Sequence, residues 1–586
     1  MTSSAGRLAR RLAFPVAILL FVGVSLTAEF RSLVRPDTGF LLDAGARVLD
    51  GQRLYIDVVE INPPLIVVLN AAIVGAARAL GVPAIVVYRV GTTAVLLAVL
   101  LTAWMIFPGM AAESTGLRRT FVLLSAFALF PLAGQDFGER EHLVLALLIP
   151  YLLLTTARSA SRNVAPRLAV LIGLAAGFAF ALKPHFLVVW LLVSGYLLLR
   201  RRVSLRTILP ESLAVGALLV GYGVAVLMWT PQYVGLVRLL AGPYNRFLND
   251  PFLHVLVTGP GAVLAIFALL AFAALRSRAR HPDLWTALAI AALACLLAGA
   301  LQQKGLRYHF YPSFALALIL LGLVARDAAT VGLRRIQAVY RWLGASVVVA
   351  AVVVVVVQNG AVALGTGRDS DREQFDRLVD IVRERAQGEP VFVMSYHLRS
   401  AYPLLTYSGV SSASRFPHLW ILASEYVHEL ADTAAMRYHT PAQMSPAERY
   451  LNRAVLEDFR ARRPKLLIVF RNARDVPANG FRRLDYLAYF GRNPEMADAL
   501  QRYQLVAELG DYRVYERVAP GATRVGPPPA AEVGDRDVIQ VQEQGVQVRL
   551  ADPTLLIAAL AFVTSLLTFV LLDRRKDRIG RTGPVE

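Results

Sequence analysis

PPLIVVLNAAIVGAARAL, residues 63–80, decides how the whole chain is placed relative to a membrane. The stretch is apolar enough to cross, but it begins with two prolines and carries Asn70 and Arg78. If it does not cross, all connections rich in arginine or lysine face the cytoplasm, as the positive-inside rule requires. These connections are GLRR (116–119), ARSASRNVAPR (157–167), RRRVSLR (200–206), RSRARHPD (276–283), RDAATVGLRRIQAVYR (326–341) and DRRKDR (573–578). We therefore predict that residues 63–80 form an interfacial helix on the outer face.

The other apolar runs predict an α-helical polytopic membrane protein with about twelve transmembrane helices and both termini in the cytoplasm. Hydrophobic residues make up 56% of the 586 residues, above the roughly 45–50% that is usual for soluble domains. The N-terminal arginines precede an apolar run without a good cleavage site, so we interpret that run as an uncleaved first span. The predicted spans are 12–29, 87–107, 119–134, 143–157, 168–182, 186–200, 208–229, 259–275, 284–301, 310–325, 342–358 and 552–573.

The charge balance and the cysteine content exclude several classes of protein. The net charge of +19 comes from 61 Lys and Arg against 42 Asp and Glu. Because much of this excess lies in short connections between apolar runs, it indicates membrane topology, and we expect no nucleic-acid partner. The single cysteine, Cys295, lies in an apolar run and rules out both an intrachain disulfide and a cysteine-based metal site.

This topology predicts three regions along the chain. Residues 1–358 form a transmembrane module, with residues 30–86 as its first external loop. Residues 359–551 form an extracytoplasmic mixed α/β domain. Residues 552–586 form the last transmembrane helix and a cytoplasmic tail. Within the external domain, the patterns predict an amphipathic helix at 371–387, buried strands at 390–396 and 465–470, and a hairpin at 505–517.

Polar residues in the first external loop lie close to the membrane. Asp37 directly follows the first span, and residues 38–50 fit an interfacial helix. Ionisable groups at this level are costly and are therefore functional candidates, although Asp37 as an N-cap of that helix is an equal alternative. We interpret Asp57 and Glu60 as ordinary loop charges.

The later external corners carry more ionisable groups than a solvated corner between two membrane spans needs. In GQDFGEREHL (134–143), the charges either serve a site or form a local network that holds the corner. In LKPHF (182–186), Lys183 either binds phosphate oxygens or reaches the interface by snorkelling. A fourth corner, LQQKGLRYHFYP (301–312), offers further cations. The candidates in these corners are Asp136, Glu139, Arg140, His142, Lys183, His185, Lys304, Arg307, Tyr308 and His309. No ligand spacing supports a metal site among them.

The layout of residues 1 to 325 resembles the C-type glycosyltransferase superfamily (GT-C), which includes protein O-mannosyltransferases, the lipid A aminoarabinose transferase and bacterial arabinosyl- and mannosyltransferases. Members have an aspartate just after the first span, interfacial helices with a Pro-Pro pair, and an acidic residue in the next external corner. Here Asp37, Pro63-Pro64 and Asp136 match these features. The corners at Lys183-Pro184 and RYHFYP (307–312) resemble corresponding later corners of the family.

The resemblance implies an inverting glycosyltransferase that uses a polyprenyl-phosphate sugar on the periplasmic face of the bacterial inner membrane. Asp37 would be the general base and Asp136 would orient the acceptor or a catalytic cation, with Glu139 as a further acid of that corner. A divalent cation, Mg²⁺ or Mn²⁺, is left open, and no metal ligand is assigned. The donor phosphate would be bound by cations of the later corners, namely Lys183, Arg307, Arg140, His185, Lys304 and His309.

Two other functions remain open from the sequence. A transporter or flippase of lipid-linked sugars also needs polar groups in a helical bundle, but it tends to place them near the bilayer midplane. A non-catalytic cell-envelope assembly protein would use the external domain to bind a partner. The sequence does not choose the sugar, and a lipid, glycan or protein acceptor is open.

Overall fold

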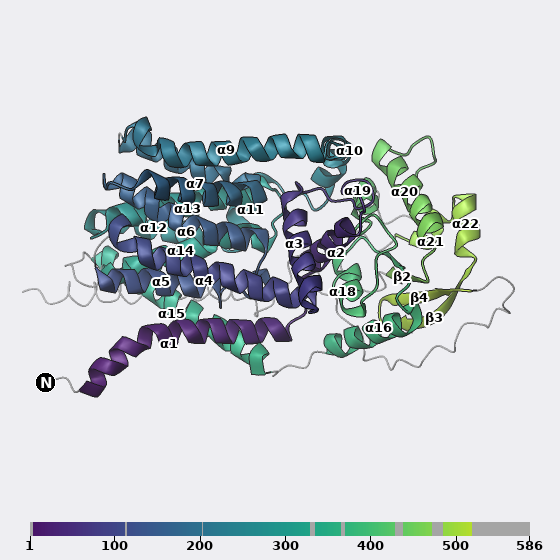
Figure 1. Cartoon of the computed structure of the whole chain (residues 1–586), viewed down its shortest axis with the longest axis horizontal. Helices are drawn as coiled ribbons and strands as arrows, with labels where there is room; N and C mark the ends of the chain where they lie inside the picture. Colours follow the sequence, from purple (N-terminus) through teal and green to yellow (C-terminus); the bar gives the residue numbers. More distant parts are fainter. Residues whose placement is uncertain are drawn as a thin grey trace, which may run out of the picture.

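The computed structural model describes residues 4–111, 114–201, 203–327, 335–364, 370–427, 437–470 and 484–518. Figure 1 shows a bundle of long helices lying side by side, with a smaller unit that contains the β-sheet at one end of the bundle. The predicted last span, 552–573, and the tail after it lie outside the described residues.

The chain is a multi-pass helical membrane protein by the length and hydropathy of its helices. Seven described helices are long and apolar enough to cross a membrane, or eight if the pair α11 (Phe252–Thr258) and α12 (Ala262–Leu275), bent by 73°, is counted as one span. The seven come from α1 (Ser4–Arg31), α4 (Ala84–Met110), α6 (Arg140–Ser159), α9 (Leu205–Trp229), α13 (Pro282–Leu301), α14 (Arg307–Asp327) and α15 (Arg335–Leu364).

Three further helices occupy predicted spans but are shorter. They are α5 (Thr115–Leu129), α7 (Pro166–Leu182) and α8 (Leu187–Gly195), the last continued by a π-helical turn at Tyr196–Arg200. The total of about twelve spans therefore stays a prediction.

Small side chains allow the central helices α6, α13 and α14 to pack closely. At Gly299 of α13, a Cβ atom would lie 2.9 Å from the ring of Phe310 in α14. Most positions of these three helices are buried, whereas α1, α9 and α15 expose much of their apolar surface. Close backbone approach at small residues is the usual way in which membrane helices associate.

Helices α2 (Pro36–Leu49) and α3 (Leu65–Leu80) lie at the end of the bundle, next to the sheet unit (Figure 1). Their backbones touch, because a Cβ atom on Gly45 would lie 2.6 Å from the backbone nitrogen of Ala71. The sequence prediction of a helix at 38–50 is confirmed. The N-cap alternative for Asp37 is wrong, because Arg35 occupies the cap position and Asp37 lies inside the first turn.

The C-terminal unit contains the predicted mixed α/β structure. Its sheet has the order β1-β2-β4-β3, with β1 (Val391–Met394) parallel to β2 (Leu466–Phe470). The hairpin of β3 (Tyr503–Leu509) and β4 (Tyr512–Arg517) is antiparallel, as its turn at Gly510 predicts. The remaining helices of this unit are α16 (Ser370–Ala386), α17 (Leu398–Ala401), α18 (Leu404–Ser408), α19 (Trp420–Glu425), α20 (Pro446–Arg462), α21 (Tyr486–Phe490) and α22 (Pro494–Leu500).

Both faces of the two parallel strands are buried, which explains why they read as continuous apolar runs. Phe392 and Leu467 pack with residues of α20 on one face. Val391 and Ile468 belong to a core on the other face, which also contains residues of α16 and of α2. The helix that carries Asp37 therefore shares a hydrophobic core with the C-terminal sheet.

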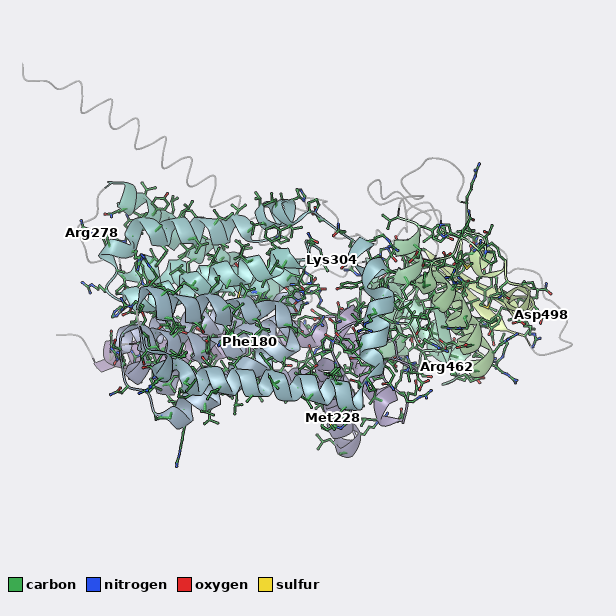
Figure 2. The ribbon with its side chains drawn as sticks, turned by 90° about the horizontal axis from the view of Figure 1, so that it is seen from above. Phe180, Met228, Arg278, Lys304, Arg462 and Asp498 are labelled. Carbon is green, nitrogen blue, oxygen red and sulfur yellow. The ribbon has the colours of Figure 1, made fainter. Side chains whose placement is uncertain are left out.

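The predicted corners gather at two opposite ends of the bundle. Figure 2 shows Lys304 at the end that meets the C-terminal unit and Arg278 at the far end. At the far end, the predicted cytoplasmic connections are joined by contacts such as that of Arg201 with Asp283, 2.8 Å apart. The grouping agrees with the charge argument, and the side of the membrane that each end faces stays a prediction.

Candidate active site

Asp37 lies in the first turn of α2, where the helix dipole favours a negative charge. Its carboxylate is partly exposed, and it makes no hydrogen bond or ion pair with any residue that the structure describes. A carboxylate with both oxygens free can accept a proton or a hydrogen bond from a bound molecule.

Asp136, 1% exposed, is held between two guanidinium groups. Its Oδ1 accepts a hydrogen bond from Arg35 at 2.6 Å, and its Oδ2 accepts one from Arg307 at 3.0 Å. Asp136 and Arg307, both predicted site residues, therefore lie together, and each is an ion-pair partner of the other. The arrangement crosslinks the first loop, the second corner and the start of α14.

Glu139 is buried at the end of the second corner, immediately before α6. Thr38 donates a hydrogen bond to its Oε1 at 3.3 Å, and the Arg35 Nε lies 3.5 Å from the same oxygen. Burial, together with the negative charge of Asp37, raises the pKa of the Glu139 carboxyl to about 8. This shift favours the protonated form of Glu139 beside the base candidate.

Lys183 is paired with a carboxylate that the sequence argument did not assign. Its Nζ donates to Glu141 Oε1 at 2.7 Å, and both side chains are buried. His309 Nε2 lies 3.9 Å from the same oxygen. Burial lowers the pKa of the Lys183 ammonium, while the Glu141 charge opposes that shift.

Arg140 is the exception among the buried cations of this end. Its side chain is 7% exposed, and its guanidinium makes no hydrogen bond or ion pair with any described residue. The guanidinium nonetheless shares its surroundings with Asp37 and Glu141, whose charges influence it. A buried guanidinium without a bonded partner is costly, so it favours an anionic ligand at this position.

Tyr308 connects the two ion pairs. The Arg35 guanidinium carbon lies 5.3 Å from the centre of its ring, and the Lys183 Nζ lies 5.6 Å from it. Such cation–π contacts fix the positions of both cations. Arg35 and Glu141 are site residues that the sequence analysis missed, although Arg35 stands only two positions before Asp37.

Three other predicted candidates lie near this cluster with different contacts. Lys304 donates to the backbone oxygens of Tyr244 and Phe247 at the end of α10 (Gln232–Arg246). His142 Nδ1 accepts from the Gly138 N–H and its Nε2 bonds the Leu129 carbonyl, so this ring holds the corner. His185 is exposed beside Lys183.

The first loop contains a second carboxylate of the site. Glu60 is only 6% exposed, so its interpretation as an ordinary loop charge is wrong. Its Oε1 accepts from the backbone and side chain of Asn62, at 2.7 and 2.5 Å, and the charges of Arg140 and Asp37 act on it. Asp57, by contrast, forms a surface pair with Arg53, as an ordinary loop charge does.

The C-terminal unit packs directly on the helix of Asp37. At Gly39, a Cβ atom would lie 3.0 Å from Thr406 Oγ1 and 3.3 Å from Tyr402 Cβ. Tyr402 donates a hydrogen bond to Asp43 at 2.7 Å, and Arg47 donates to the Ser414 carbonyl at 3.0 Å. The C-terminal unit therefore covers the helix that carries Asp37.

The carboxylates do not fit the divalent cation that the resemblance leaves open. Within the part of the chain that the structure describes, no group of three or more His, Cys, Asp or Glu side chains is arranged to hold a metal ion. Asp136 and Glu141 are already neutralised by Arg35, Arg307 and Lys183. These two carboxylates are therefore not free to bind a divalent cation.

The chain resembles solved structures at low sequence identity. No family model matches it, and no curated protein matches it. Among solved structures it is similar to the arabinofuranosyltransferase AftD from Mycobacteria, with a TM-score of 0.42 and 15% identity over 87% of this chain. The chain covers 40% of the length of that structure.

Proposed function

We propose that this chain is a membrane glycosyltransferase that moves a sugar from a polyprenyl-phosphate donor to an acceptor hydroxyl. The observation that supports it is the pair of unpartnered charges: the partly exposed carboxylate of Asp37 and the buried guanidinium of Arg140, within the described residues. A base and an anion-binding group in one place are what transfer from a phosphate-linked sugar requires.

The proposed reaction is a single displacement. The acceptor oxygen attacks the anomeric carbon while Asp37 takes the proton from its hydroxyl. The bond between the anomeric carbon and the phosphate oxygen breaks, and its electron pair leaves with polyprenyl phosphate. Arg140 stabilises the negative charge that develops on this leaving group.

The remaining cations act on the site through the carboxylates that they hold. Lys183 neutralises Glu141, and Arg307 with Arg35 neutralises Asp136. Arg140 lies among the charges of Glu141, Glu60 and Asp37, but it bonds none of them within the described chain, so its N–H groups are available to phosphate oxygens. In this proposal Lys183 and Arg307 shape the phosphate site, and Lys304 fixes the end of α10 next to it.

The position of these charges favours transfer over transport. The elements that carry them, α2 and the starts of α6 and α14, meet beside the C-terminal unit, where Figure 2 labels Lys304. Transporters instead tend to bind substrate near the bilayer midplane. Transfer also needs a base for the acceptor hydroxyl, and Asp37 lies in α2, at the same end of the bundle.

The full chain in liposomes would be supplied with radiolabelled polyprenyl-phosphate hexoses and pentoses and with an envelope extract as acceptor. We expect release of polyprenyl phosphate and a new glycosidic product, and the loss of both in Asp37→Asn. Asp57→Asn, which changes a partly exposed aspartate of the same loop that pairs with Arg53, is the matched control. Movement of donor across the bilayer without product would overturn the proposal, as would full activity of Asp37→Asn.

A further inference from the structure

Two arginines lie at the start of α5, at the far end of the bundle from the candidate active site. The other end of α5 reaches that site, where the Leu129 carbonyl contacts His142. Arg118 lies in the first turn of α5, Arg119 follows it, and the turn contains no acidic residue. Because the helix dipole is positive at this end, two cations here are unfavourable without an anion to balance them.

Aromatic rings from two other helices hold these guanidinium groups. The guanidinium carbon of Arg118 lies 3.8 Å from the centre of the Trp104 ring in α4. That of Arg119 lies 6.0 Å from the centre of the Phe14 ring in α1. The two rings are stacked with their centres 5.1 Å apart, so these four side chains form one arginine–aromatic cluster between α1, α4 and α5. An arginine stacked on a ring still presents N–H groups at its edge, which match a phosphate.

The two guanidinium groups of the cluster have no counter-ion among the described residues. Neither forms a hydrogen bond or an ion pair with a described residue, and both Nε atoms are buried without a partner there. Buried polar atoms are normally hydrogen-bonded, so the cluster lacks an acceptor.

The acidic residues closest in sequence do not balance both charges. Glu113, the one acidic residue of the connection between α4 and α5, lies outside the described residues and carries a single negative charge. Asp327 pairs with a third arginine, Arg326, at 2.9 Å. That arginine also lies near the start of α5, because a Cβ atom on Gly116 would be 3.3 Å from its Nη2. Within this connection, at least one positive charge is left for an anion.

An apolar stripe on α4 leads from the cluster toward the middle of the helix. Leu97, Leu101 and Trp104 have the spacing i, i+4 and i+7, which places them on one helix face over about 10 Å. Leu97 is 40% exposed and Leu101 is 59% exposed. A ligand with a phosphate at one end and a hydrocarbon chain at the other would contact both the arginines and this stripe, whereas free phosphate would contact the arginines alone.

We infer that the arginine–aromatic cluster binds the phosphate of an anionic phospholipid, whose acyl chain lies along Leu97 and Leu101. Basic pockets between membrane helices bind such headgroups. A zwitterionic phospholipid is a poorer ligand, because its own ammonium group is repelled by the two arginines. This lipid site is separate from the candidate active site and does not depend on the proposed function.

The test measures which phosphate compound the full chain retains. The protein would be purified in detergent, stripped of lipid and supplied with phosphatidylglycerol, phosphatidylcholine or inorganic phosphate, and bound molecules would be identified by native mass spectrometry. We expect phosphatidylglycerol to be retained in preference to phosphatidylcholine and to resist displacement by excess inorganic phosphate. Equal retention of the two lipids, or displacement by inorganic phosphate, would overturn the inference.

The variant Arg118→Gln/Arg119→Gln locates the site. Each lost arginine should weaken the binding of phosphatidylglycerol about fivefold, and the double variant about 25-fold. Arg119→Gln alone, which removes the longer of the two ring contacts, gives the single step with less change in packing. The matched control, Arg276→Gln/Arg278→Gln, removes the same charge from exposed positions of the same end (Figure 2) and should bind as the wild type does. Wild-type binding by the cluster variants, or an equal loss in the control, would contradict the assignment.

Discussion

The carboxylate of Asp136 and the guanidinium of Arg307, 171 positions apart in the chain, meet at 3.0 Å inside the protein. Arg35 binds the other oxygen of the same carboxylate. The two residues that the sequence assigns to different substrates therefore neutralise each other, and they join the second and fourth corners of one end of the bundle.

Replacing Asp136 by asparagine should destabilise the protein, because it leaves two cations without their shared carboxylate. Breaking a buried pair in this way costs about 3–5 kcal/mol. Thermal denaturation in detergent should show a clearly lower Tm for Asp136→Asn. Adding Arg307→Gln should recover part of the loss, and a double mutant no more stable than Asp136→Asn would contradict the pairing.

Replacing Asp37 by asparagine should reduce transfer by about 10²–10⁴, the range for loss of a general base. The protein should accumulate normally and keep its Tm, because Asp37 has no partner among the described residues. Initial rates with labelled donor provide the measurement, and Asp57→Asn should retain the wild-type rate.

Replacing Arg140 by glutamine should separate activity from stability. Transfer should fall about 10²–10³-fold, as for other lost groups that stabilise developing charge. The Tm should not fall, since the substitution removes a buried cation that has no bonded partner in the described chain. Lys183→Gln is the contrasting variant. It leaves the buried Glu141 carboxylate without its ion-pair partner, so the Tm of this variant should fall.

The proton on Glu139 should make stability depend on pH. Its pKa is raised from 4.5 to about 8, so between these values the folded protein binds one proton that the unfolded chain does not. Stability is then full below pH 4.5 and falls as pH rises to about 8, by at most about 1.4 kcal/mol per pH unit. Tm values from about pH 5 to about pH 9 should fall more steeply for the wild type than for Glu139→Gln.

The sequence predicts the elements of the fold well where one physical rule governs them. Hydrophobic length predicts the long helices, and alternating or continuous apolar runs predict β1, β2 and the β3–β4 hairpin. The positive-inside rule assigns the external corners to one side of the membrane, and the structure brings these corners to one end of the bundle. A helix follows Pro64 as the sequence predicts, and its interfacial placement stays a prediction.

The pairing of the charged side chains could not be predicted in the same way. From spacing along the chain alone, Lys183, Arg307 and Arg140 are equally good candidates for binding the donor phosphate. Only the fold shows that Lys183 forms an ion pair with Glu141 and that Arg307 forms one with Asp136. Arg140 is then left without a bonded partner in the described chain. Glu60 was misjudged for the same reason, because its burial depends on residues far away in the chain.

The hydrogen bond from Tyr402 to Asp43 spans 359 positions of the chain. During synthesis at about 5–20 residues per second, α2 must wait about 20–70 s for the surface that covers it. Until then its apolar face, which later joins the core of the sheet unit, has no partner and must be sheltered by lipid or a chaperone. A fragment released from the ribosome before residue 402 would contain every charged group of the bundle end. It would lack the part of the C-terminal unit that covers the helix carrying Asp37.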